Sequence, residues 1–325
     1  MRKLAIVLLL LLAALSIGRT LVSAPQRGGQ QPRRARRPVW DETVVGDIFF
    51  RNVLTDALVG KRPESLGRTP LAGNGPTTPT EKPATKTASS GGLYPWSRII
   101  SAETIEDEVK AIKLLVDENI STPNKFKTDG YKQARLHFTM LAMLFGIVGE
   151  YDGQIRWQKD APAARDLFAR AGKNAKAGTV QGYQEAKQRK LDLQDLVGGG
   201  SLQTSKQAES KANWPRVCDR APLMQRLEGA HQQGLMPWTS SGSEFRGNNE
   251  QLLAAGEIVA AIAETMLQEG MEDADDDDYR SYCSQLKQAA LEIVDAVKRN
   301  SYKEARKAVG TITKSCDQCH ETYRG

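Results

Sequence analysis

The residues best suited to chemistry lie near the carboxyl end of the chain, where the run Cys316 to His320 reads Cys-Asp-Gln-Cys-His. Two thiols three residues apart occupy neighbouring points of one helical turn, so both can form thioethers to the vinyl groups along one edge of a porphyrin. The imidazole that follows can reach the iron from one face of the ring. This C-x-x-C-H spacing predicts one covalent haem c, attached through Cys316 and Cys319, with His320 as the proximal iron ligand.

Other uses of two thiols and an imidazole fit this sequence less well. A closed zinc site normally draws on a second ligand pair, and Cys218 and Cys283 do not have the spacing of such a pair. A thioredoxin-like dithiol follows a strand at the start of a helix, whereas this motif ends a predicted helix. A disulfide within the motif is a poor fit to a regular helix. The sequence therefore favours haem.

The elements that must position the motif are predicted to be helices. The chain has 325 residues, of which 40% are hydrophobic and 26% charged, with a net charge of +6, and this composition excludes a wholly disordered or multi-span membrane protein. Aromatic residues make up only 6%, and Ala, Leu, Lys, Glu and Gln dominate the long middle stretches. We therefore predict an all-α protein.

Apolar residues recur at helical spacing in two stretches of about 100 residues each. The first stretch, 96–200, predicts a four-helix domain without haem, with helices at 101–118, 130–151, 161–176 and 180–197. The second, 215–325, predicts a haem-binding domain with helices at 220–233, 249–268, 276–299 and 302–323. The expected fold is two tandem antiparallel four-helix bundles, the C-terminal one carrying the covalent haem.

The last predicted helix also indicates which way the motif faces. Its apolar residues form one stripe with alternating steps of four and three residues: Ala305, Val309, Ile312, Cys316, Cys319 and Tyr323. Because the two cysteines belong to this stripe, we expect them to face inward between helices.

The N-terminal part of the chain carries a different signal. Residues 1–24 combine Arg2 and Lys3, an apolar run and a small-residue end, which predicts a signal peptide or an uncleaved N-terminal anchor. Residues 25–95 read as a basic arm, a short amphipathic helix and a linker rich in Pro, Thr, Gly and Ser. We expect an exported, periplasmic protein. If the N-terminal segment is not cleaved, it would tether the protein to the membrane.

The ending from Cys316 to Gly325 resembles the C-terminus of class II c-type cytochromes, the cytochrome c-prime family. Members of this family are four-helix bundles in which the haem hangs from the last helix, and the resemblance covers about residues 215–325. It implies that Arg324 is the basic residue close to the proximal histidine. It also implies that Arg220 lies near the haem and that Met224, four residues later, covers the distal face of the ring.

The identity of the distal group decides what such a haem can do. A His/Met pair makes a six-coordinate, electron-transferring haem, whereas a Met224 that only blocks the pocket leaves a position for NO or CO. His231 lies on the same helical face seven residues on and is a rival ligand, but two turns span roughly 10 Å, so both residues cannot sit over one iron. The simpler expectation for His231, and for His137 in the first unit, is a partly exposed or capping side chain.

The state of the other two cysteines and the role of the acidic run each allow more than one interpretation. Cys218 and Cys283 would lie near the same end of an up-down-up-down bundle, so they form either a disulfide or two buried free thiols. The acidic run 272–278 favours a solvated loop at the start of a helix over a calcium site or a docking surface for a basic partner.

No hydrolase, nucleotide-binding or nucleic-acid-binding motif is present. The sequence therefore predicts a mono-haem electron carrier and not an enzyme. Its expected partners are redox proteins, and a homodimer is compatible with the sequence. The alternatives are a five-coordinate haem module that binds NO or CO, and a docking protein in which the haem is a structural staple.

Overall fold

A computed structural model describes residues 94–202 and 208–323 of the chain. The predictions for the leader, for the amphipathic segment and nearly all of the linker, and for Arg324 lie outside these residues. Within these residues all regular secondary structure is helical, apart from one isolated β-bridge between Tyr94 and Tyr151. The prediction of an all-α protein is therefore confirmed. None of the described helices is both long and apolar enough to cross a bilayer.

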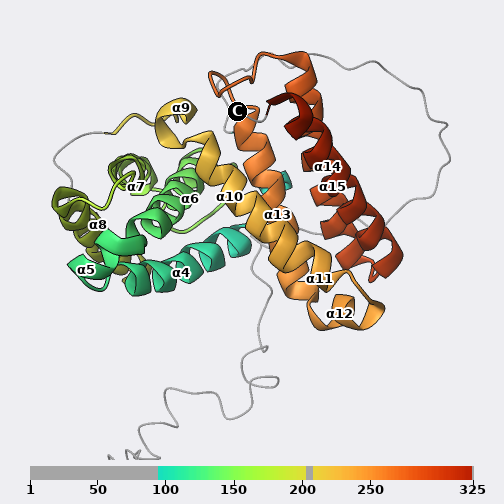
Figure 1. The fold of residues 1–325 in the computed structure, drawn as a ribbon, viewed down its shortest axis with the longest axis horizontal. Helices are drawn as coiled ribbons and strands as arrows, with labels where there is room; N and C mark the ends of the chain where they lie inside the picture. Colours follow the sequence, from blue (N-terminus) through green and yellow to red (C-terminus); the bar gives the residue numbers. More distant parts are fainter. Residues whose placement is uncertain (1–93, 203–207, 324–325) are drawn as a thin grey trace, which may run out of the picture. The chain divides into compact units, whose positions relative to one another are not determined.

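The helices follow the predicted order closely (Figure 1). Those of the first half are α4 (Ala102–Asn119), α5 (Pro123–Lys125), α6 (Tyr131–Glu150), α7 (Ala161–Asn174) and α8 (Val180–Gly198). Those of the second half are α9 (Trp214–Val217), α10 (Arg220–Ala230), α11 (Met236–Trp238), α12 (Gly242–Gly247), α13 (Asn249–Met266), α14 (Asp277–Lys298) and α15 (Tyr302–Tyr323).

Local signals explain where several helices begin and end. The side chains of Ser101, Thr179 and Asp276 cap α4, α8 and α14 by accepting hydrogen bonds from backbone N–H groups of the first turn. Helix α8 ends at Gly198, and the following Gly199 has a φ of 92°, a left-handed conformation that glycine adopts without strain. Three helices end more than one residue earlier than predicted: α7 at Asn174, α13 at Met266 and α10 at Ala230. After Ala230 the chain continues as a π-helical turn, His231–Leu235.

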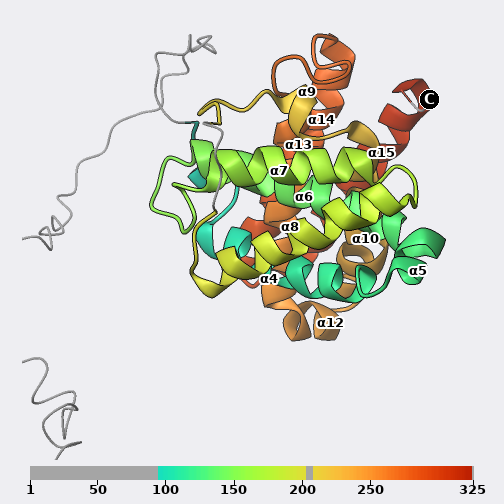
Figure 2. The same ribbon diagram turned by 90° about the vertical axis from the view of Figure 1, so that its left-hand side faces the viewer.

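The core forms where the central helices of each half meet their neighbours. Helix α6 packs mainly on α7 and also on α4, and the rings of Phe138, Phe145 and Phe168 stack between α6 and α7. Figure 2 looks onto α4, α7 and α8, which cover α6. In the second half α14 packs between α13 and α15, and α10 contacts both α6 and α13. All these helices belong to one compact unit, and the boundary between two domains stays a prediction.

His137 is buried, which corrects the expectation of a partly exposed side chain. It lies on α6 with 7% of its surface exposed, because neighbouring helices cover α6 on several sides. Its Nδ1 has no hydrogen-bond partner among the residues that the structure describes. Burial, together with the positive charge of Arg226, lowers its pKa from 6.5 to about 4. The imidazole is therefore neutral near pH 7.

This burial predicts a pH-dependent stability. Between pH 6.5 and about 4 the unfolded chain binds a proton at His137 that the folded chain does not. The free energy of unfolding therefore decreases as the pH is lowered through this range, and His137 contributes about 3 kcal/mol to that decrease. His137→Gln should flatten that part of the curve, which urea unfolding across this pH range measures. The same loss in the variant and the natural chain would contradict the assignment.

Candidate functional site

Helix α15 carries the C-x-x-C-H motif in its last two turns. The residues of its predicted stripe lie on the covered face: Ala305, Val309, Ile312 and Cys319 are buried, and Cys316 and Tyr323 are half-buried. The inward placement follows from the spacing, because steps of three and four residues keep one face of a helix against its neighbour. His320, the next residue after Cys319, is exposed.

The chemical state of the two thiols is set by this burial. Burial raises the pKa of the Cys316 thiol to about 11, with a further contribution from Asp317, and it also raises the pKa of the Cys319 thiol. Both groups are therefore neutral thiols near pH 7. In the described ranges no three or more His, Cys, Asp or Glu side chains converge as a metal cluster.

This arrangement fits a haem better than a bare metal ion. A zinc site needs its protein ligands gathered around the ion, whereas Cys319 is buried and His320 is exposed on the same helix. In a haem the porphyrin supplies the four equatorial ligands of the iron. The chain has to supply only an imidazole for the iron and two sulfurs that bond to the vinyl carbons of the porphyrin. The donors on α15 meet that requirement.

The helical segment that carries Met224 reaches α15 at its C-terminal end. Leu223, Leu227 and Ala230 form the buried face of α10, and Met224 is half-buried beside them. Seven residues beyond Met224, His231 Nε2 lies 2.8 Å from Thr313 Oγ1 on α15, three residues before Cys316. This contact places the end of the segment, two turns beyond Met224, beside the helix that carries the motif.

His231 is half-buried, as the simpler expectation had it. Burial lowers the pKa of its imidazole, and the nearby Asp317 carboxylate opposes this shift. Its Nε2 already has a hydrogen-bond partner in Thr313. Of the two candidate distal residues, Met224 is therefore the one whose ligand atom is not engaged by a described hydrogen bond.

Arg220, the first residue of α10, pairs with the acidic run. Its guanidinium contacts Glu272 at 2.9 Å and also Asp273, and it lies 5.6 Å from the centroid of the Tyr279 ring. Asp276, farther along the same run, caps α14. The acidic side chains of the run are all exposed, so the expectation of a solvated loop at the start of a helix is confirmed, and three of them also have partners.

Tyr279 is the residue that the sequence reasoning missed. It belongs to the apolar stripe of α14, but its buried hydroxyl has no hydrogen-bond partner in the described part of the chain, and its ring packs on Tyr323 at 5.3 Å. A tyrosine inside an apolar stripe was the available signal, because a buried phenol normally has a partner. The Tyr279 hydroxyl is therefore a buried donor without a described partner, beside the guanidinium of Arg220.

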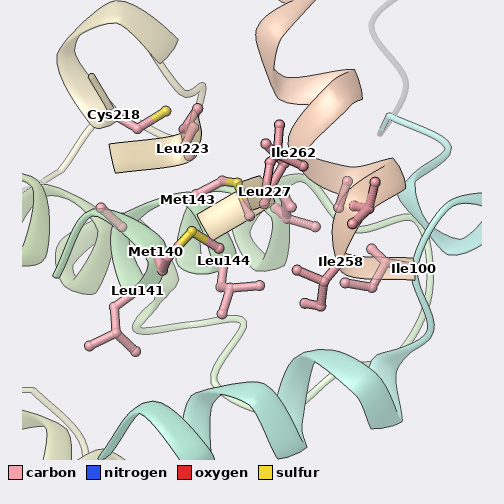
Figure 3. Close-up of a cluster of buried hydrophobic side chains, with 14 of the residues drawn as sticks. Ile100, Met140, Leu141, Met143, Leu144, Cys218, Leu223, Leu227, Ile258 and Ile262 are labelled. Atoms are coloured by element: carbon pink, nitrogen blue, oxygen red, sulfur yellow. The ribbon is translucent and has the colours of Figure 1, made fainter. Parts of the chain in front are cut away.

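The structure shows Cys218 and Cys283 as free buried thiols and not as a disulfide. The Cys218 sulfur lies 3.9 Å from the Trp214 carbonyl oxygen, and Figure 3 shows the residue beside Leu223 at the start of α10. Cys283 lies on α14, one turn after Tyr279, and its environment includes Tyr279 and Cys319. The two thiols thus belong to different contacts, which sequence spacing could not reveal.

A comparison with protein families identifies part of the chain. Residues 273–324 match the family described as Cytochrome C'. No curated protein and no solved structure matches the chain. The match includes the whole C-x-x-C-H motif but begins after α10, so Arg220 and Met224 lie outside it. The resemblance seen in the sequence is thereby confirmed for residues 273–324, which are similar to the cytochrome c' family of c-type haem proteins.

Proposed function

We propose that the chain binds one haem c through Cys316 and Cys319, takes His320 as the proximal iron ligand, and transfers single electrons. The observation that carries this proposal is the C-x-x-C-H motif on the covered face of α15, within a segment that matches the cytochrome c' family. The haem, when bound, supplies an iron that changes reversibly by one electron. The chain then has no bond-making step to catalyse.

In this proposal the side chains of α15 hold the haem. The two cysteines fix the ring to α15, and Val309 and Ile312 on the same stripe offer it an apolar neighbourhood. We assign Met224 as the distal ligand, because it is the candidate thioether of the resemblance and the end of its helical segment contacts α15 through His231. A His/Met pair would raise the reduction potential. In this proposal 215–325 is the haem-binding four-helix bundle, and 96–200 is the second bundle, without haem.

Gas binding is the second candidate function. It is favoured by the partial exposure of Met224, which suits a side chain that covers the haem without bonding to the iron. An EPR spectrum of the oxidised holoprotein distinguishes the two: low-spin iron supports the His/Met electron carrier, and high-spin iron supports the module that binds NO or CO. A structural haem would show neither a reversible redox wave at an electrode nor a gas adduct.

Export is part of the same proposal. Haem attachment to C-x-x-C-H, a signal-like segment at 1–24 and few cysteines are consistent with a periplasmic electron carrier that meets redox partner proteins. We expect deletion of 1–24 to abolish the haem-containing form in a host that assembles c-type cytochromes outside the cytoplasm. Cell fractionation with haem staining measures this, and haem-containing protein in the cytoplasm of the deletion strain would contradict export.

A further inference from the structure

Helix α10, which carries Met224, packs on the half of the chain that lacks the motif. It contacts α6 more extensively than it contacts α13 of its own half, and α15 is not among the helices on which it packs closely. Both halves therefore hold α10, and α6 is the helix on which α10 itself packs most extensively apart from the π-helical turn that continues it.

The apolar contact between the halves is continuous. Figure 3 shows side chains of α6, α10 and α13 meeting in one cluster. Its members are buried, and they include Met140, Met143 and Leu144 of α6, Leu223 and Leu227 of α10, and Ile258 and Ile262 of α13. Buried apolar side chains in contact resist displacement, because separating them exposes their surface to water.

An ion pair also joins α10 to the half without the motif. The Arg226 guanidinium on α10 donates from Nε and Nη2 to Glu108 Oε1 on α4, at 3.2 and 2.9 Å. Only 17% of the Glu108 side chain is exposed, so water weakens this ion pair less than it would a surface pair. Arg226 lies two residues after Met224, and the contact therefore ties the Met224 segment directly to the half without the motif.

From these contacts we infer that the half without the motif is a positioning support for the distal side of the haem, with Glu108 as a positioning residue. This inference rests on the proposed function, because it concerns the haem that Cys316 and Cys319 would hold. An iron–thioether bond is a weak bond to a soft ligand, so its occupancy depends on where the helix holds the sulfur. A Met224 that only covers the ring is equally sensitive to the position of α10.

The test is CO binding to the reduced, haem-loaded full chain, since CO must displace or pass Met224 in either coordination state. Glu108→Gln removes the charge that holds Arg226, and we expect a roughly three- to tenfold rise in CO affinity. Glu185→Gln is the matched control: Glu185 is also an arginine partner, with 16% of its side chain exposed, but it pairs with Arg170 and Arg189 within its own half. Equal CO affinities of the two variants would overturn the inference.

A second pair of variants tests the same support through packing. Leu144→Ala opens the cluster against α10, whereas Leu193→Ala removes the same atoms from an equally buried site on α8, which packs on α4 and α7. We expect faster amide hydrogen exchange at 220–230 only in Leu144→Ala, and equal exchange in both variants would count against the inference. If the natural chain holds no covalent haem, the proposed function fails; if it holds haem but Glu108→Gln behaves like its control, only this inference fails.

Discussion

The Cys316→Ser/Cys319→Ser variant, matured in a host that assembles c-type cytochromes, is expected to contain no covalently bound haem. A serine hydroxyl does not replace the sulfur that bonds to the porphyrin vinyl groups, so the variant loses both attachment points on α15. The measurement is haem-stained denaturing gel electrophoresis together with the mass of the intact chain. The expected loss is complete, which makes this the largest effect that the proposal predicts.

The chain offers its own control for this experiment. Cys218 and Cys283 are two buried free thiols outside the motif, so Cys218→Ser/Cys283→Ser makes the same chemical change elsewhere. This control should keep its covalent haem, although burying two hydroxyls will lower its stability. A motif variant that keeps covalent haem, or a control that loses it while still folded, would show that the wrong cysteines have been assigned.

The second large effect is expected from Met224→Leu. Leucine retains most of the volume but has no sulfur to offer the iron, so the oxidised haem should change from low-spin to high-spin and the reduction potential should fall. CO affinity of the reduced protein should rise by at least about tenfold, since no ligand has to be displaced. EPR, redox titration and CO titration measure these three changes.

Met236→Leu is the matched control, because Met236 lies on α11 with 49% of its surface exposed and belongs to neither the motif nor α10. Its spectrum and potential should equal those of the natural protein. An unchanged EPR spectrum in Met224→Leu would remove Met224 from the iron and would leave the gas-binding function as the better proposal.

The helices could be predicted because their signals are local. The stripe Tyr279, Cys283, Leu286, Ala290 and Ile293 repeats at steps of three and four residues, and all of these side chains are buried on α14. The C-x-x-C-H motif is local for the same reason, since five adjacent residues define it. Neither prediction requires knowledge of which helices meet in space.

The environment of the site could not be predicted, because it depends on contacts between distant segments. His137 and Cys218 are buried where α6 meets other helices, and the weak apolar pattern of α10 did not indicate that its covered face would meet α6. The ion pairs of Arg220 depend on a loop in which Asp273 has a φ of 60°. A left-handed aspartate cannot be recognised from an acidic run alone.

The most direct test of the central claim is extraction of the natural holoprotein with acidified acetone, followed by measurement of its intact mass. We predict that the pigment stays with the protein and that the mass exceeds that of the polypeptide by one haem, with the added mass on the peptide that contains Cys316 and Cys319. Pigment that leaves with the acetone, or a chain that carries no added mass, would contradict covalent attachment and with it the function proposed for this protein.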